Sequence, residues 1–209
     1  MRHRIARSAG AATLTALLAV TAVACGTDDG AETSTQVSTT EHNDADVAFA
    51  SDMLQHHAQA LSMVDLTRDR PLDSKVQQLT EQIRDAQAPE IELFSDWLTE
   101  WGEEIPPTVR DHVNAGHGSD DSSDPTADLD HGDMPGMMTA EEMDELESAS
   151  DSEFQTLWLE MMIEHHAGAV AMAEGHQEDG RYAPAVDLAG DIVESQSAEI
   201  EAMRGLLDS

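Results

Sequence analysis

Two observations predict an all-α protein built as a four-helix bundle from two duplicated helical hairpins. Residues 53–98 match residues 162–207 at a constant offset of 109 residues, without a gap. Apolar residues in both copies recur at helical spacing. Because two copies are too few for a solenoid, we expect two hairpins that pack together as one bundle. We place this bundle domain at residues 44–209 of the 209-residue chain.

The N-terminal residues 1–24 have the pattern of a lipoprotein-type signal peptide. Three arginines precede an apolar stretch that is short for a membrane span. The stretch ends before Cys25, the only cysteine of the chain, with a small residue before it as in a bacterial lipobox. Because a lone cysteine has no disulfide partner, we expect Cys25 to carry a lipid that anchors the protein to the outer face of the cell membrane. Ordinary secretion with cleavage after Ala24 is the alternative.

A tether and the first hairpin follow the signal. Residues 25–43 are rich in Gly, Asp, Thr, Ser and Glu, which predicts a flexible tether. The first hairpin is predicted at residues 44–105, where each helix has one apolar stripe. Pro89 lies inside the second predicted helix, where it removes a backbone hydrogen bond and should kink the helix.

Residues 106–138 interrupt the helical pattern. They are rich in Asp, Ser, Gly and His and have no periodicity, which predicts a mobile acidic linker. Thr139 and Glu142 then form a capping-box pattern that restarts helix. The second hairpin is predicted at residues 139–209, with its turn near Gly180.

The two hairpins carry the same polar residues on stripes that should face the bundle interior. Met-x-x-His-His occurs on the first helix of each hairpin and Gln-x-x-Glu on the second. Spacing of three or four residues places the members of each motif on one helix face. Buried imidazoles and carboxylates need partners, so we expect these residues to meet near the bundle axis. The set consists of Met53, His56, His57, Gln87, Glu90, Met162, His165, His166, Gln196 and Glu199.

This set has two interpretations. In the first, Glu90 and Glu199 hydrogen-bond the imidazoles and fix the register of the core. In the second, the residues form a metal centre, and the methionine three residues before each His pair favours this interpretation. We expect the Met and His residues to be ligands. The Glu and Gln residues would support them or bind metal occasionally.

The thioether groups discriminate between metals. Di-iron bundles use Glu-x-x-His on two helices, where this chain has Met-x-x-His. Methionine sulfur is a poor ligand for oxygen-activating iron but suits Cu(I), and imidazole binds copper in either oxidation state. Methionine in place of this glutamate therefore favours copper binding over the oxidase chemistry of di-iron sites.

A second Met and His cluster lies at the end of the predicted linker. His131, Met134, Met137 and Met138 occupy a polar, glycine-containing stretch where methionine is not explained as core. One interpretation is a loose accessory metal site. The other is a partly folded lid whose Met137 and Met138 pack on the bundle.

Charge and motif content exclude several functions. The formal net charge of −33 argues against nucleic acid, because its binders need a basic face. The same charge argues against binding to an anionic lipid surface. The sequence has no Gly-rich phosphate loop, Cys-x-x-Cys pair or Gly-x-Ser-x-Gly motif, so a non-enzymatic role is favoured.

The chain resembles the bacterial domain of unknown function 305 over about residues 43–208. The motifs that carry the resemblance are Phe49-x-x-x-Met53-x-x-His56-His57, Met134-Pro135-Gly136-Met137-Met138, Met161-Met162-Ile163-Glu164-His165-His166-x-x-Ala169 and Gln196-x-x-Glu199-Ile200-x-x-Met203. The resemblance implies a ferritin-like four-helix bundle that is exported or membrane-anchored. It also implies copper handling, because some members are associated with copper binding and tolerance.

Three hypotheses for function follow. The first is a cell-envelope lipoprotein that binds copper for sequestration or transfer outside the cytoplasm. The second is a ferritin-like metal-dependent oxidase. The third is a structural or partner-binding lipoprotein whose histidines form only a core network. Expected partners are a metal ion, the membrane through the lipid on Cys25, and either an envelope protein or further copies of the chain.

Overall fold

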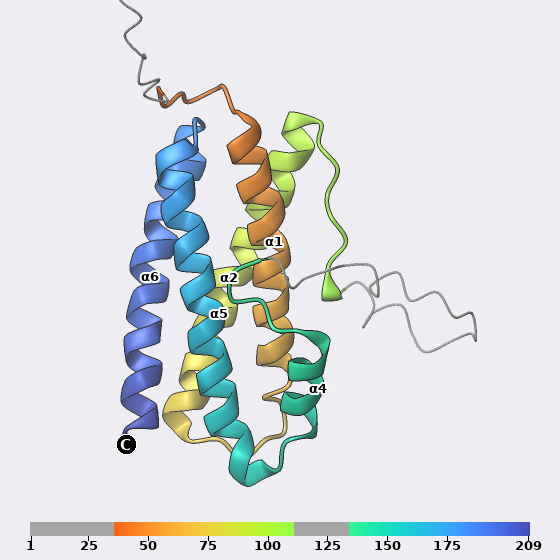
Figure 1. Ribbon diagram of the computed structural model, residues 1–209, viewed down its shortest axis with the longest axis vertical. Helices are drawn as coiled ribbons and strands as arrows, with labels where there is room; N and C mark the ends of the chain where they lie inside the picture. Colours follow the sequence, from red (N-terminus) through yellow and green to blue (C-terminus); the bar gives the residue numbers. More distant parts are fainter. Residues whose placement is uncertain (1–35, 111–133) are drawn as a thin grey trace, which may run out of the picture. The chain divides into compact units, whose positions relative to one another are not determined.

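The computed structural model describes residues 36–110 and 134–209, and the long helices in these ranges form a four-helix bundle (Figure 1). The long helices are α1 (Asp44–Asp65), α2 (Ser74–Trp101), α5 (Asp151–Asp179) and α6 (Ala183–Leu207). A short helix, α4 (Ala140–Ser148), precedes α5. Apart from one isolated β-bridge between Ser38 and Tyr182, the described residues contain no β-structure. The prediction of an all-α bundle is confirmed.

The four long helices pack as two hairpins. α1 packs most extensively on α2, and α5 on α6, while α1 and α5 join the two hairpins. α2 and α6 contact each other only slightly. The interface between the hairpins is therefore mainly the contact between α1 and α5, the two helices that carry the His pairs.

Local signals account for the helix boundaries. Asn43 caps α1 by accepting a hydrogen bond from the Asp46 backbone N–H, and the Asp46 side chain accepts one from the Asn43 backbone in return. Thr139 and Glu142 form the same reciprocal cap at the start of α4, as the sequence predicts. Gly102 caps the C-terminus of α2, and its φ of 79° suits a residue without a side chain. The helix runs through Pro89 as one element.

A polar layer divides the apolar core along the bundle. One apolar cluster lies on one side of the layer and includes Val76, Ile83, Phe154, Trp158 and Met203. The other cluster lies on the opposite side and includes Phe49, Phe94, Trp97, Ala169 and Ile192. The four histidines of the repeated motif occur between these clusters along α1 and α5, and all four are fully buried.

The segment before α1 is held against the turn between α5 and α6. The Ser38 backbone N–H donates to Arg181 O, and the Ala183 N–H donates to Ser38 O. The His42 ring stacks on Trp101 with 4.6 Å between ring centroids. The C-terminal end of the predicted tether is thus packed on the bundle, because its backbone pairs with a second segment. The predicted signal peptide and Cys25 lie outside the described residues.

Residues 134–138, which we call the strap, also pack on the bundle (Figure 1). The sequence places this segment in the mobile linker, but Met137 and Met138 are only 7% and 3% exposed. Met138 belongs to the apolar cluster that includes Trp158.

No helix among the described residues has the length and apolar composition needed to cross a membrane.

Candidate metal centre

Each hairpin holds one histidine of its pair against a glutamate of its second helix. His57 Nε2 of α1 lies 2.6 Å from Glu90 Oε2 of α2. His166 Nε2 of α5 lies 2.8 Å from Glu199 Oε2 of α6. Both imidazoles have 0% side-chain exposure, whereas the carboxylates are 19% and 18% exposed. Each glutamate thus reaches from the bundle surface to a fully buried ring.

The other histidine of each pair lies at the contact between the hairpins. The rings of His56 and His165 are 3.8 Å apart between centroids, with an interplanar angle of 44°. His56 Nε2 is 3.0 Å from the Pro135 carbonyl oxygen of the strap. The carboxylates thus hold one ring of each pair, while the other two rings meet at an angle between the hairpins.

Burial keeps the two central rings neutral. It lowers the pKa of His56 to about 3, with the neighbouring His57 contributing in the same direction. Burial likewise lowers the pKa of His165 well below its usual value, and His56 adds to this effect. Both rings are therefore neutral at neutral pH, which is the form of imidazole that can bind a metal ion.

Hydrogen bonding determines which nitrogen of each ring carries the available lone pair. The Glu90 carboxylate, the Glu199 carboxylate and the Pro135 carbonyl can only accept, so Nε2 of His57, His166 and His56 donates. Nδ1 of these three rings has no hydrogen-bond partner among the described residues. Neither nitrogen of His165 has one within the same ranges. Buried nitrogens without a partner cost free energy, and a metal ion is one group that would satisfy them.

The remaining predicted residues surround this layer. Met53 and Met162 are fully buried and lie one helical turn before His56 and His165. Gln87 and Gln196 are 2% and 3% exposed. In the part of the chain that the structure describes, both side-chain amide atoms of Gln87 and the oxygen of Gln196 lack partners. Met53 and Met162 belong to the two different apolar clusters, so they lie on opposite sides of the histidine layer.

Within residues 36–110 and 134–209, no three His, Cys, Asp or Glu side chains are grouped so that they could hold an ion. Each glutamate is instead engaged by a histidine.

The predicted accessory cluster is only partly described. His131 lies outside the described residues, and Met134 is partly exposed. Met137 and Met138 are buried against the bundle, and this burial favours the lid interpretation over a loose, solvated metal site.

A second buried polar group contains His176 and Asp46, which no sequence motif singles out. His176 of α5 is 5% exposed, and its Nε2 lies 3.3 Å from Oδ1 of the fully buried Asp46. Asp46 also accepts hydrogen bonds from the backbone N–H groups of Arg181 and Tyr182. Burial lowers the pKa of His176, while the Asp46 charge opposes this effect. These contacts connect α1 to the turn after α5. The sequence signal for the burial of His176 is its position three residues after Ala173, on the apolar stripe of the same helix.

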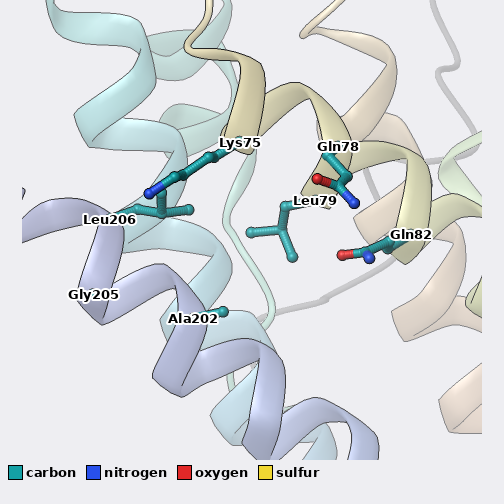
Figure 2. A pocket seen from close by; sticks show the side chains of 7 residues that line it. All are labelled: Lys75, Gln78, Leu79, Gln82, Ala202, Gly205 and Leu206. Carbon is teal, nitrogen blue, oxygen red and sulfur yellow. The ribbon is translucent and has the colours of Figure 1, made fainter.

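One surface groove lies apart from these residues (Figure 2). It has a volume of about 430 Å³ and lies between the start of α2 and the end of α6. Its lining consists of Lys75, Gln78, Leu79, Gln82, Ala202, Gly205 and Leu206. Because none of these side chains is a strong metal ligand, the groove is not part of the candidate metal centre.

Comparisons with known proteins agree with the bundle and its motifs. No curated protein sequence matches the chain. Among solved structures, a DUF305 protein from Streptomyces coelicolor is 34% identical, with a TM-score of 0.62 over 78% of this chain and 92% of its own. A DUF305 fragment from Deinococcus radiodurans is 28% identical, with a TM-score of 0.63 over 80% and 97%. The Cu(II)-bound form of CopM is 25% identical, with a TM-score of 0.59 over 78% and 95%.

A family model covers nearly all of the described domain. The model of the domain of unknown function DUF305 matches residues 46–207. This range includes both His pairs, both glutamates and the strap. The chain therefore belongs to the DUF305 family.

Proposed function

We propose that this protein binds copper and sequesters or transfers it outside the cytoplasm. The ligands are Met53, His56, His57, Met162, His165 and His166. Glu90 and Glu199 hold the outer imidazoles by Nε2, and Gln87 and Gln196 lie beside the ligands. When bound, copper would satisfy the buried nitrogens and would be held in a largely apolar surrounding.

One observation carries this proposal: four fully buried imidazoles have nitrogens without partners among the described residues. A core network alone would pair its nitrogens, because an unmade buried hydrogen bond destabilises the fold. Here the carboxylates occupy only the Nε2 atoms of the outer rings. The pattern resembles carboxylate–histidine–metal units, in which the second ring nitrogen binds the ion.

Ligand chemistry supports copper over harder metals. Thioether sulfur and neutral imidazole together suit Cu(I), whereas iron and zinc sites usually include carboxylate or thiolate. CopM, which shares the fold, has been solved in its Cu(II)-bound form. Export of the present chain is supported by its N-terminal sequence and by the Streptomyces coelicolor relative, which is described as a candidate secreted protein. Lipid anchoring through Cys25 is part of the proposal.

An anaerobic titration of the chain from residue 26 with Cu(I), beside Zn(II) and Fe(II), tests the function. We expect tight binding of Cu(I) and a rise in thermal stability, because a ligand that binds only the folded state stabilises it. A His56→Gln/His165→Gln variant retains polar side chains of similar length and should lose most of this binding. Unchanged Cu(I) stoichiometry in a correctly folded variant would place the metal elsewhere. Absence of binding by the parent protein would leave the histidines as a core network.

A further inference from the structure

We propose that the strap presents His56 to the metal through Nδ1 and controls the exchange of copper at the centre, with Gln59 and Gly168 as its positioning residues. This inference rests on the proposed function, since it concerns the same centre. It differs from that function in naming the element that must move for an ion to enter or leave.

The strap is a defined turn with three contacts to the bundle. The Met137 N–H donates to Met134 O across Pro135-Gly136, and Gly136 has a φ of 75°. A proline followed by a glycine of positive φ fits a type II turn. The turn directs the Pro135 carbonyl oxygen at His56 Nε2, 3.0 Å away. Because the carbonyl can only accept, it retains the proton on Nε2 and leaves the Nδ1 lone pair for a metal.

Gln59 holds the other end of the strap. Its Nε2 donates to Met138 O at 2.8 Å, and its Oε1 accepts from the Met138 N–H at 2.7 Å. Gln59 is 2% exposed, so both bonds are shielded from water. The Gln59 amide thus pairs with both the N–H and the C=O of Met138, as the backbone of an adjacent β-strand does in a sheet.

Gly168 gives the strap room to approach α5. A Cβ atom at position 168 would lie 1.9 Å from the Pro135 carbonyl oxygen and 2.8 Å from the Gly136 Cα. Both neighbours are backbone atoms, which cannot rotate away. Any residue other than glycine at this position would therefore displace the strap.

Gln59 and Gly168, which both position the strap, occupy equivalent places in the internal repeat. Gln59 and Gly168 are equivalent positions at the offset of 109 residues, yet they differ completely in chemistry. One binds the strap and the other makes space for it, on the two helices that form the interface between the hairpins. The repeat departs from symmetry here because a single strap crosses both helices.

The strap also makes the two central histidines unequal. His56 is bound through Nε2, whereas His165 has no partner on either nitrogen among the described residues. His56 is therefore the ligand that the strap orients, whereas the strap does not hold His165. Because the Pro135 carbonyl lies on His56 Nε2 and Met137 and Met138 are buried against the bundle, we expect the strap to move when an ion exchanges at His56.

Two glycine substitutions in α5 test the proposal with a matched control. Gly168→Ala places a methyl group into the Pro135 carbonyl, whereas Gly175→Ala meets nothing within 4 Å. Both changes raise helix propensity equally, so they differ only at the strap. Gln59→Met removes both hydrogen bonds to Met138 at similar side-chain length, and it serves as the second variant if Gly168→Ala fails to fold.

Two readouts decide the proposal. The first is the ¹⁵N NMR signature of the His56 ring in metal-free protein. We expect a single Nε2–H form in the parent and in Gly175→Ala, and a mixture of forms in Gly168→Ala and Gln59→Met. The second is the rate of Cu(I) transfer to an excess of a soluble chelator. We expect the strap variants to release copper about tenfold faster, which corresponds to losing one or two hydrogen bonds.

The outcomes separate this proposal from the proposed function. Release rates in Gly168→Ala and Gln59→Met that equal the rate in Gly175→Ala would overturn control by the strap. A single Nε2–H form of His56 that persists in both strap variants would overturn its positioning role. If the parent protein binds no copper, the proposed function fails, while the NMR comparison still decides whether the strap orients His56.

Discussion

Acid should destabilise the metal-free protein through His56 in a defined pH window. In the folded state the pKa of this ring is about 3, whereas an unfolded histidine has its usual value of about 6.5. Between these values the unfolded chain binds the additional proton, so stability falls as the pH falls. Above about pH 6.5 the full contribution of the neutral ring is present. Lowering the pH from about 7.5 to about 5 should therefore cost about 2 kcal/mol from His56 alone.

Chemical denaturation followed by tryptophan fluorescence at several pH values measures this loss. His56→Gln is the matched comparison, because its amide can still donate to the Pro135 carbonyl but does not titrate. Carboxylates titrate in both proteins, and the difference between the two pH slopes isolates His56. Inside the window we expect the parent slope to exceed that of the variant by about 1.4 kcal/mol per pH unit. Equal slopes would show that His56 is not held neutral in the folded protein and would refute the lone-pair argument.

Three further predictions concern the ligands and the core. Met53→Leu/Met162→Leu conserves volume, so unfolding free energy should change by less than about 3 kcal/mol for the pair, while Cu(I) affinity falls and Zn(II) affinity does not, as competitive titration would show. Glu90→Ala should weaken copper binding about 10- to 100-fold, because it leaves the His57 Nε2–H unpartnered, whereas Glu90→Gln retains an acceptor and should lose less; equal losses would contradict the orienting role. Trp158→Ala should cost about 3–5 kcal/mol in denaturant titrations, since the side chain is fully buried and its indole donates to a backbone carbonyl; a loss under about 1 kcal/mol would contradict this packing.

Most of the fold could be predicted because its signals are local. The capping box at Thr139 and the helical periodicity of both hairpins involve residues within a few positions of one another. The ends of the tether and of the linker carry no such local signal. Residues 38–43 and the strap lack periodicity, yet they are held by backbone contacts with distant segments. Composition identifies such segments as irregular, but it does not show what they contact.

The burial of the repeated histidines could also be predicted, because each motif has a spacing that places its members on one helix face. The sequence could not predict that each glutamate pairs with only one histidine of its hairpin. A helix pattern shows which face is buried but not which of two adjacent residues points toward the partner helix. The contact between Asp46 and His176 was missed for the same reason, since it depends on how α1 meets the end of α5.

The sequence by itself determined the helices, their duplication and the soft, nitrogen- and sulfur-rich character of the candidate ligands. These properties follow from residue type and short-range spacing. Only the tertiary structure decided which imidazole nitrogens lack partners and which histidine is capped by the strap. The hydrogen bond between His56 and Pro135 joins residues 79 positions apart, and the His56–His165 contact joins the two hairpins. Such contacts are formed by the packing of whole helices, and their geometry cannot be obtained from the local sequence of either partner.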